Sequence, residues 1–402
     1  MKGTRKPVRA RIVALVVALA LVGLACKPIP HPNFVVVDDA SSVHVLGLSG
    51  DGNYVVVTST AASASVPGPG LWRVDRRDGT AVQLPEGAKF ERISDDGQRI
   101  SYRIEPEPSW GAGLRVWDNG RIVAPPPFTV MSEDLLFGIF VGFFDTVLQR
   151  WELATGARTV IDTGGVVPLY PLQISDDGNL ASYQGGDPSG HWGTPTCDAY
   201  HVDLTTMETT VSPCVNGSSI DSDYFWVGLD WVEFVEFDRR VGGPRRLQVH
   251  SRSQPGTVLL EVSTVGSYFD EIHFVGSPPV LWAADVLAEG TLPVGCDWYH
   301  VACTIETLSV VTASLFDQRR FDVDPDMTRS SNEDPMQSSV SEDGRFLAYQ
   351  DHVLDRAWGT DEDLPEVPGY ANRGGPWFFS DDNRVIVSGP TTSGWYEYLA
   401  DA

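Results

Sequence analysis

Short apolar runs alternate with polar turns along most of this chain, and one such passage recurs. In "ISDDGNLASYQ" from Ile174, an apolar strand end is followed by a Ser-Asp-Asp-Gly turn and a second apolar strand. Aspartate side chains cap the backbone amides of a turn, and glycine adopts the left-handed conformation, so the passage predicts a hairpin corner. Copies begin at Leu48, Ile93, Met131, Ile174, Val340 and Phe379, with weaker ones at Ser219 and Phe269.

The copies recur about every 38 to 50 residues, and a second pair of strands follows most of them, as in "LRVWDNGRIVA" from Leu114. Four strands in such a period are typical of a β-propeller blade rather than of a helical solenoid. Eight copies favour eight blades. Seven stays open, because two copies are weak and the interval from Phe269 to Val340 exceeds one period.

The two ends of the repeat region complement each other. The last copy is followed by enough chain for only three strands, whereas "NFVVVDD" from Asn33 forms an isolated strand before the first copy. We expect the N-terminal strand to complete the last blade and close the ring, because closure removes exposed sheet edges. The predicted fold is therefore all-β, with one propeller over residues 33–402.

The corners resemble those of the TolB and WD40-like propeller repeats, in which a Ser-Pro-Asp-Gly turn precedes a strand similar to "RIAF". Here acids occupy the usual Pro position, so the resemblance is to a divergent form. No α/β domain precedes the repeats, unlike in TolB itself, so that protein's translocation role is not implied. The acids at the Pro position are Asp95, Asp176, Glu342 and Asp381.

The N-terminal segment has the parts of a secretory signal peptide. Five basic residues precede an apolar run of about 14 residues from Ile12 to Ala25, which is too short to span a bilayer as a helix. "LVGLAC" resembles a bacterial lipobox, which predicts cleavage after residue 25 and acylation of Cys26. Residues 26–32 would then form a Pro-rich tether to the membrane. An ordinary signal peptide is the alternative.

The net charge of the chain argues against nucleic acids as partners. Removal of the five basic leader residues takes the formal net charge from −25 to −30, which disfavours nucleic-acid binding.

The exported setting favours disulfides among the four remaining cysteines, and three pairings are possible. Local closure favours Cys197 with Cys214, and Cys296 with Cys303.

Motifs for covalent chemistry are absent from the sequence. It contains no Gly-x-Ser-x-Gly, no HExxH, no P-loop and no dinucleotide fingerprint. The strand-like segments contain histidines that we expect to be hydrogen-bonded structural residues. These are His201, His250, His273 and His300.

One acidic segment has the ligand spacing of an EF-hand loop. It departs from that pattern at Met327, where the sharp turn needs glycine. A solvated acidic loop is the favoured interpretation, with calcium as a weak alternative and no other cofactor expected. The corner aspartates are likewise expected to cap turns. The candidate calcium ligands are Asp322, Asp324, Asp326 and Glu333.

Two long loops interrupt their blades and could form a recognition surface, because loops on a rigid scaffold often carry binding residues. Trp192, Trp298 and Tyr299 on these loops are candidate contact residues; packing over blade edges is the alternative. The sequence thus predicts an exported, membrane-anchored, monomeric binding or scaffolding module for an envelope protein or peptide. The alternative is an envelope enzyme of lyase, glycosidase or quinoprotein type, with its site at the channel mouth.

Overall fold

The computed structural model describes most of the region predicted to be the propeller. The described residues are 33–38, 42–104, 113–142, 147–175, 177–187, 194–212, 231–238, 243–251, 257–265, 268–275, 278–288, 305–323, 338–349, 352–363, 377–381, 385–388 and 395–399. Every regular element in these ranges is a β-strand. No helix there is long and apolar enough to cross a membrane.

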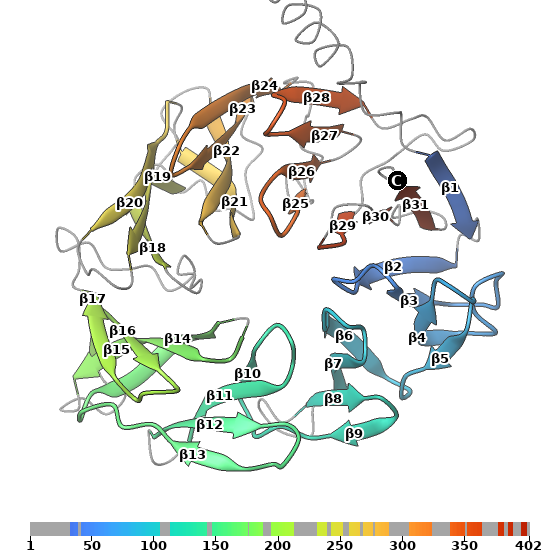
Figure 1. Ribbon diagram of the computed structural model, residues 1–402, viewed down its shortest axis with the longest axis horizontal. Coiled ribbons are helices and arrows are strands. Elements are labelled where there is room, and N and C mark those ends of the chain that lie inside the picture. The colour runs from blue at the N-terminus through green and yellow to red at the C-terminus, as the bar shows by residue number, and fades with distance from the viewer. Residues whose placement is uncertain are drawn as a thin grey trace, which may run out of the picture.

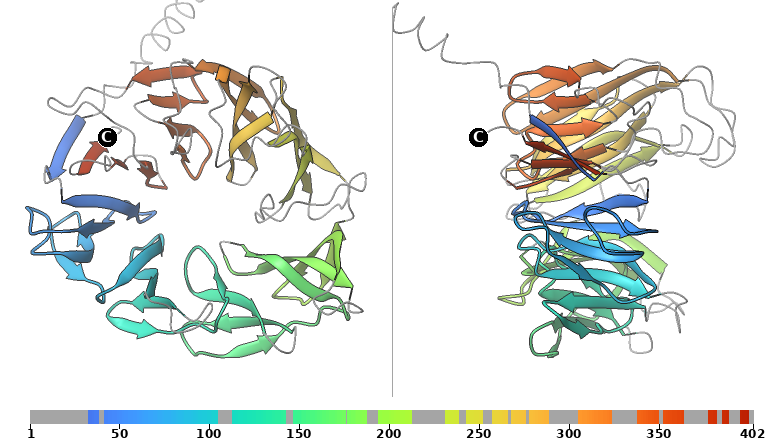
Figure 2. Two further views of the ribbon diagram at one scale, coloured as in Figure 1. Left: turned by 180° about the vertical axis from the view of Figure 1, so that it is seen from behind. Right: turned by 90° about the vertical axis from the view of Figure 1, so that its right-hand side faces the viewer.

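The chain forms a single all-β propeller with four-stranded blades (Figure 1). Each blade is an antiparallel sheet whose strands follow sequence order from the centre of the ring outwards, except that the first strand of the chain forms the outer edge of the last sheet. The blades stand side by side around that centre, as the view from behind also shows (Figure 2, left). This confirms the predicted fold class and the hairpin pairs that follow the corners.

The first half of the chain supplies four complete blades. They contain β2 (Val43–Leu48), β3 (Tyr54–Ser59), β4 (Gly70–Asp75) and β5 (Ala81–Gln83); β6 (Ala88–Ile93), β7 (Arg99–Ile104), β8 (Leu114–Asp118) and β9 (Arg121–Val123); β10 (Val130–Met131), β11 (Phe137–Val141), β12 (Leu148–Glu152) and β13 (Arg158–Val160); and β14 (Val167–Ile174), β15 (Leu180–Asp187), β16 (Thr194–Asp203) and β17 (Thr209–Ser212).

The second half supplies the remaining sheets. They contain β18 (Trp231–Asp238), β19 (Gly243–Ser251) and β20 (Val258–Ser263); β21 (Tyr268–Val275), β22 (Val280–Ala288), β23 (Ile305–Ser314) and β24 (Gln318–Val323); β25 (Ser338–Val340), β26 (Phe346–Tyr349), β27 (His352–Asp355) and β28 (Thr360–Asp363); and β29 (Trp377–Phe379), β30 (Val385–Ser388) and β31 (Trp395–Leu399), with β1 (Asn33–Asp38) paired to β31.

The weak copies of the repeated passage differ from the clear ones. The copy from Phe269 contains no Ser-Asp-Asp-Gly corner; it is strand β21, joined to β22 through residues 276–279. The copy from Ser219 lies outside the described residues. Sheet β18–β20 has three strands among the residues described, whereas the other sheets have four.

The hydrophobic core is divided into layers between neighbouring blades. In β3, Val55 and Val57 pack towards the blade of β29–β31, whereas Tyr54 and Val56 pack towards blade β6–β9. Alternate residues of an extended strand point to opposite faces, so a strand between two blades buries both faces. This explains why the second strands contain continuous apolar runs such as "YVVV" rather than alternating ones.

Five of the clear corners are hydrogen-bonded turns built in the same way. Ser94, which is fully buried, donates its hydroxyl to Asp96 at 2.7 Å and accepts the backbone N–H of Arg99 at 3.0 Å. Asp96 also accepts the backbone N–H of Gln98 at 3.0 Å. The same bonds recur at the corners of Ser49, Ser132, Ser175 and Ser341.

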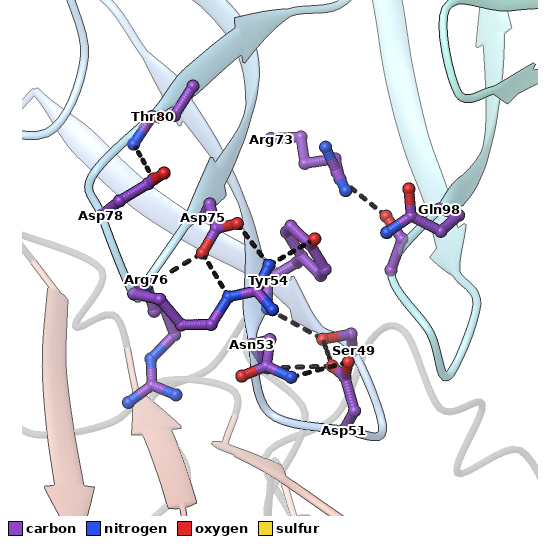
Figure 3. A network of polar contacts seen from close by, with 12 residues as sticks. Ser49, Asp51, Asn53, Tyr54, Arg73, Asp75, Arg76, Asp78, Thr80 and Gln98 are labelled. Carbon is purple, nitrogen blue, oxygen red and sulfur yellow. Dashed lines mark hydrogen bonds and ion pairs between the residues drawn. The ribbon is translucent and has the colours of Figure 1, made fainter.

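The corner glycine also joins one blade to the previous one. Gly97 has a φ of 64°, and a Cβ at this position would overlap the ring of Tyr54 in blade β2–β5. Arg73 lies over the same ring at 3.8 Å and donates to the carbonyl of Gly97 at 2.6 Å (Figure 3). Gly178 packs in the same way on Phe137, and Gly344 on Val280.

Candidate functional site at the inner rim

The two acidic positions of the corner have different roles. The acid in the third position caps the turn, as predicted: Asp51, for example, accepts from Ser49 at 2.7 Å and from the backbone N–H of Asn53 at 2.9 Å (Figure 3). In the second position, where the TolB and WD40-like repeats have Pro, the described side chains of Asp95, Glu342 and Asp381 interact with acids of other corners. Turn capping, which was expected for the corner aspartates, is therefore confirmed for the third position.

The second-position acids of several blades gather at the centre of the ring. Asp95 of blade β6–β9 is repelled by Glu133 of blade β10–β13 and by Glu342 of blade β25–β28. Asp381, next to β29, is repelled by Asp95 and Glu133 and shares a hydrogen bond with Glu342. These four residues form the inner-rim carboxylates. They are up to 286 positions apart in the chain but lie at one end of the innermost strands (Figure 1).

Electrostatics at the rim favour the protonated acids. Partial desolvation, followed by repulsion from Glu133 and Glu342, raises the pKa of Asp95 to about 6. Desolvation also raises the pKa of both Glu342 and Asp381, and repulsion adds to this effect, from Asp381 at Glu342 and from Asp95 at Asp381. All four side chains keep substantial contact with solvent. A ligand can therefore reach these carboxylates, and a positive charge among them would relieve their repulsion.

The backbone holds neighbouring corners at fixed positions. The N–H of Asp51 donates to the carbonyl of Asp95 at 2.9 Å, and the N–H of Asp381 donates to the carbonyl of Gly50 at 2.7 Å. Gly50 stands where other corners have an acid, and a Cβ there would overlap the carboxylate of Asp381. Glycine at position 50 thus leaves space for the Asp381 side chain.

The arrangement can bind cations or transfer protons. Carboxylates attract ammonium and guanidinium groups, and a pair of carboxyls with raised pKa can exchange a proton near neutral pH. Among the residues that the structure describes, no group of three or more His, Cys, Asp or Glu side chains is arranged to hold a metal ion.

The site residues predicted from sequence lie mostly outside the described part of the chain. The structure describes the backbone of Cys197 in β16 and of Asp322 in β24. The assignments of lipidation, disulfides, binding loops and calcium stay predictions. The residues outside the described ranges are Cys26, Cys214, Cys296, Cys303, Trp192, Trp298, Tyr299, Asp324, Asp326 and Glu333.

The described strand histidines have structural contacts. His201 is 1% exposed, and its Nδ1 lies 2.7 Å from the hydroxyl of Ser182 on the neighbouring strand. His273 contacts Ser338 of the next blade at 2.8 Å, and burial lowers its pKa to about 4. These two histidines are hydrogen-bonded as predicted. His250 lies in β19, and His300 lies outside the described residues.

Comparison with known proteins supports the fold. No family model matches the chain, and no curated protein matches it. Among solved structures, dipeptidyl peptidase 4 of Porphyromonas gingivalis matches with a TM-score of 0.51 and 11% identity, over 88% of this chain. The chain spans 56% of the peptidase's length. This likeness shows a β-propeller and does not bear on activity.

Two further structures match with lower scores. An oligogalacturonate lyase in complex with manganese has a TM-score of 0.43 and 13% identity, over 92% of this chain and 96% of the lyase. The WD40 domain of SCAP from fission yeast has a TM-score of 0.47 and 8% identity, over 92% of this chain and 98% of that domain.

The inner-rim carboxylates could have been found from the repeat itself. Aligning the corners shows an acid at the same position of Asp95, Glu133, Asp176, Glu342 and Asp381. In a propeller, equivalent positions of different blades surround one axis, so a repeated acid at the inner end of a blade predicts a ring of charge. The alignment was interpreted only as turn chemistry, and this signal was missed.

Proposed function

We propose that the protein is an exported, membrane-anchored propeller that binds an envelope protein or peptide through a cationic group at the inner rim. The observation that carries the proposal is the convergence of acids from distant blades at one solvent-accessible place. Lys or Arg of a partner would replace the mutual repulsion of Asp95, Glu133, Glu342 and Asp381 with attraction.

The scaffold that we infer has eight blades, with β1 completing the last one. Support comes from the sheet pattern of the described residues, in which seven sheets have four strands and one has three. The antiparallel pairing of β1 with β31 joins the first described strand to the last. Such a closed ring resists spreading, which keeps the rim carboxylates at fixed separations.

The membrane anchor is the second part of the proposal. It is supported by the lipobox-like "LVGLAC" before Cys26, and several acyl chains would give lasting attachment. Metabolic labelling with an alkyne fatty acid tests the anchor: we expect label on the wild-type protein and none on Cys26→Ala. A wild-type protein without label would contradict it.

A matched pair of variants tests the rim. The rim variant combines Asp95→Asn, Glu342→Gln and Asp381→Asn. The control removes the same charge from exposed residues of other regions, with Glu86→Gln, Glu208→Gln and Glu362→Gln. Each tagged protein is crosslinked in native membranes, purified, and its partners are identified by mass spectrometry.

We expect one envelope protein to be recovered with the wild type and with the control, and to be depleted at least tenfold with the rim variant. Its recovery should also fall as salt is raised, because the contact is ionic. Equal recovery with the rim variant and the control would show that the rim is not the binding site.

An enzyme is the second candidate, favoured by one specific observation. Asp95 has its pKa raised to about 6, and Glu342 shares a hydrogen bond with Asp381, so the rim contains acids suited to proton transfer near neutral pH. A screen of polysaccharides and glycosides tests this function. Turnover by the wild type that is lost in Asp95→Asn would support catalysis, and the absence of turnover would favour the binding role.

A further inference from the structure

Three large apolar side chains are exposed on two adjoining turns. In the turn between β23 and β24, Phe316 is 86% exposed and Leu315 is 39% exposed. In the turn between β27 and β28, Trp358 is 61% exposed. We call Leu315, Phe316 and Trp358 the aromatic patch. An exposed cluster of this kind marks an interaction surface more often than scattered single side chains do.

The two turns are bound to each other. Arg356, two positions before Trp358, donates to the hydroxyl of Ser314 at 2.6 Å and forms an ion pair with Asp317. A Cβ on Gly359 would lie 3.0 Å from the guanidinium of Arg319. These contacts join the turn of blade β25–β28 to that of blade β21–β24. The aromatic patch is therefore one surface, flanked by arginines.

The aromatic patch lies on the face of the ring that carries the corners. The N–H of Arg356 donates to the carbonyl of Arg345 at 2.8 Å, and Arg345 directly follows the corner glycine Gly344. The turn with Trp358 thus lies beside a corner. We call this side the corner face, and it also carries the inner-rim carboxylates.

The propeller begins on the same face. Asn33, the first residue of β1, is paired with Leu399 of β31, and Leu399 is paired with Val385, the first residue of β30. Because β30 follows the corner that contains Asp381, the start of β1 is level with the corners. Strand β1 is the neighbour of β28 around the ring (Figure 1). The chain therefore enters the propeller one blade away from Trp358.

We propose that the aromatic patch inserts into the interfacial region of the membrane that carries the acylated Cys26. The six residues from Lys27 to Pro32 can span at most about 20 Å, so the anchor holds the start of β1 near the bilayer. Tryptophan and phenylalanine are favourable at the lipid headgroups, and arginine can extend its charge towards water. The inference rests on the anchor of the proposed function.

This placement orients the proposed binding site. The anchor and the aromatic patch occupy neighbouring blades, so these blades lie nearest the bilayer. The corner face of the ring is turned towards the membrane. The inner-rim carboxylates then face the space next to the bilayer. A partner would present its Lys or Arg close to the membrane surface.

Photo-crosslinking in living cells tests the contact with lipid. In the full-length chain, benzoylphenylalanine replaces either Phe316 or Trp358. Both substitutions are conservative, because one aromatic side chain replaces another. The control position is Val160, which is 64% exposed on β13, across the ring from the patch (Figure 1). After irradiation, the peptide containing each position is analysed for phospholipid adducts, and acylation of Cys26 is measured in the same samples.

We expect at least tenfold more lipid adduct at Phe316 and Trp358 than at Val160. If Cys26 is acylated but lipid adducts are equal at the three positions, the inference is overturned and the anchor stands. Protein adducts in place of lipid at Phe316 and Trp358 would also overturn it. A Cys26 without acyl chains would refute the anchor and, with it, the insertion of the patch.

Discussion

The corner glycine gives a quantitative test of how the blades are joined. Gly97 needs a left-handed backbone, with φ of 64°, and its Cα lies against the ring of Tyr54 in the previous blade. That ring cannot easily move aside, because Arg73 lies over its face and Arg77 donates to its hydroxyl at 2.6 Å. The change Gly97→Ala should therefore cost both backbone strain and overpacking.

The two costs can be separated with a matched glycine. Gly79 has φ of 74°, and no atom lies within 4 Å of a Cβ built on it. Gly79→Ala should lower the free energy of unfolding by about 1 kcal/mol, from the left-handed strain alone. Overpacking costs about 1–3 kcal/mol more, so Gly97→Ala should lower it by about 2–4 kcal/mol.

Urea unfolding, followed by tryptophan fluorescence and far-ultraviolet circular dichroism, measures both variants; the two transitions must coincide for the free energies to be comparable. In a Tyr54→Ala background, the extra cost of Gly97→Ala should disappear, which isolates the contact. The reasoning is refuted if Gly97→Ala and Gly79→Ala differ by less than about 0.5 kcal/mol, or if the extra cost persists without Tyr54.

Three further predictions concern the rim, a buried pair and a strained residue. Because the pKa of Asp95 is raised from 3.8 to about 6 in the folded state, its carboxylate lowers the free energy of unfolding increasingly as pH rises through this range. Asp95→Asn should therefore stabilise the protein at pH 7.5, by at most about 1 kcal/mol after solvent screening. Urea unfolding should show this gain at pH 7.5 and none below pH 3.8. Ser182→Ala removes a hydrogen bond of the buried His201 and should cost about 1–3 kcal/mol; an unchanged urea midpoint would contradict this. Leu135 occupies the corner-glycine position with φ of 58° and is fully buried, so Leu135→Gly should destabilise by about 2 kcal/mol, the lost burial outweighing the relieved strain; a thermal midpoint at or above that of the wild type would refute it.

Much of the fold could be predicted because its determinants are local. Most of the clear corners place Ser, Asp and Gly within four residues, and the bonds that these residues form do not depend on the rest of the chain. The period of the corners then predicts blades, since four short strands fill the interval. The weak passage from Phe269 shows where prediction from local turns fails. Its turn lacks the Ser-Asp-Asp-Gly sequence, so only the pairing of β21 with β22 in the structure locates the two strands.

The sequence by itself determined the class of fold, the position of the clear corners and the turn-capping acids, because these follow from contacts between residues close in the chain. Only the tertiary structure decided which side chains meet between blades or across the ring. Asp95 and Glu342 are 247 positions apart, and no spacing in the chain predicts that they repel each other. Likewise, Gly97 is a turn residue in the sequence, but the packing of neighbouring blades makes it a contact of Tyr54. These contacts depend on how the blades pack around a common axis, and that packing is a property of the whole ring.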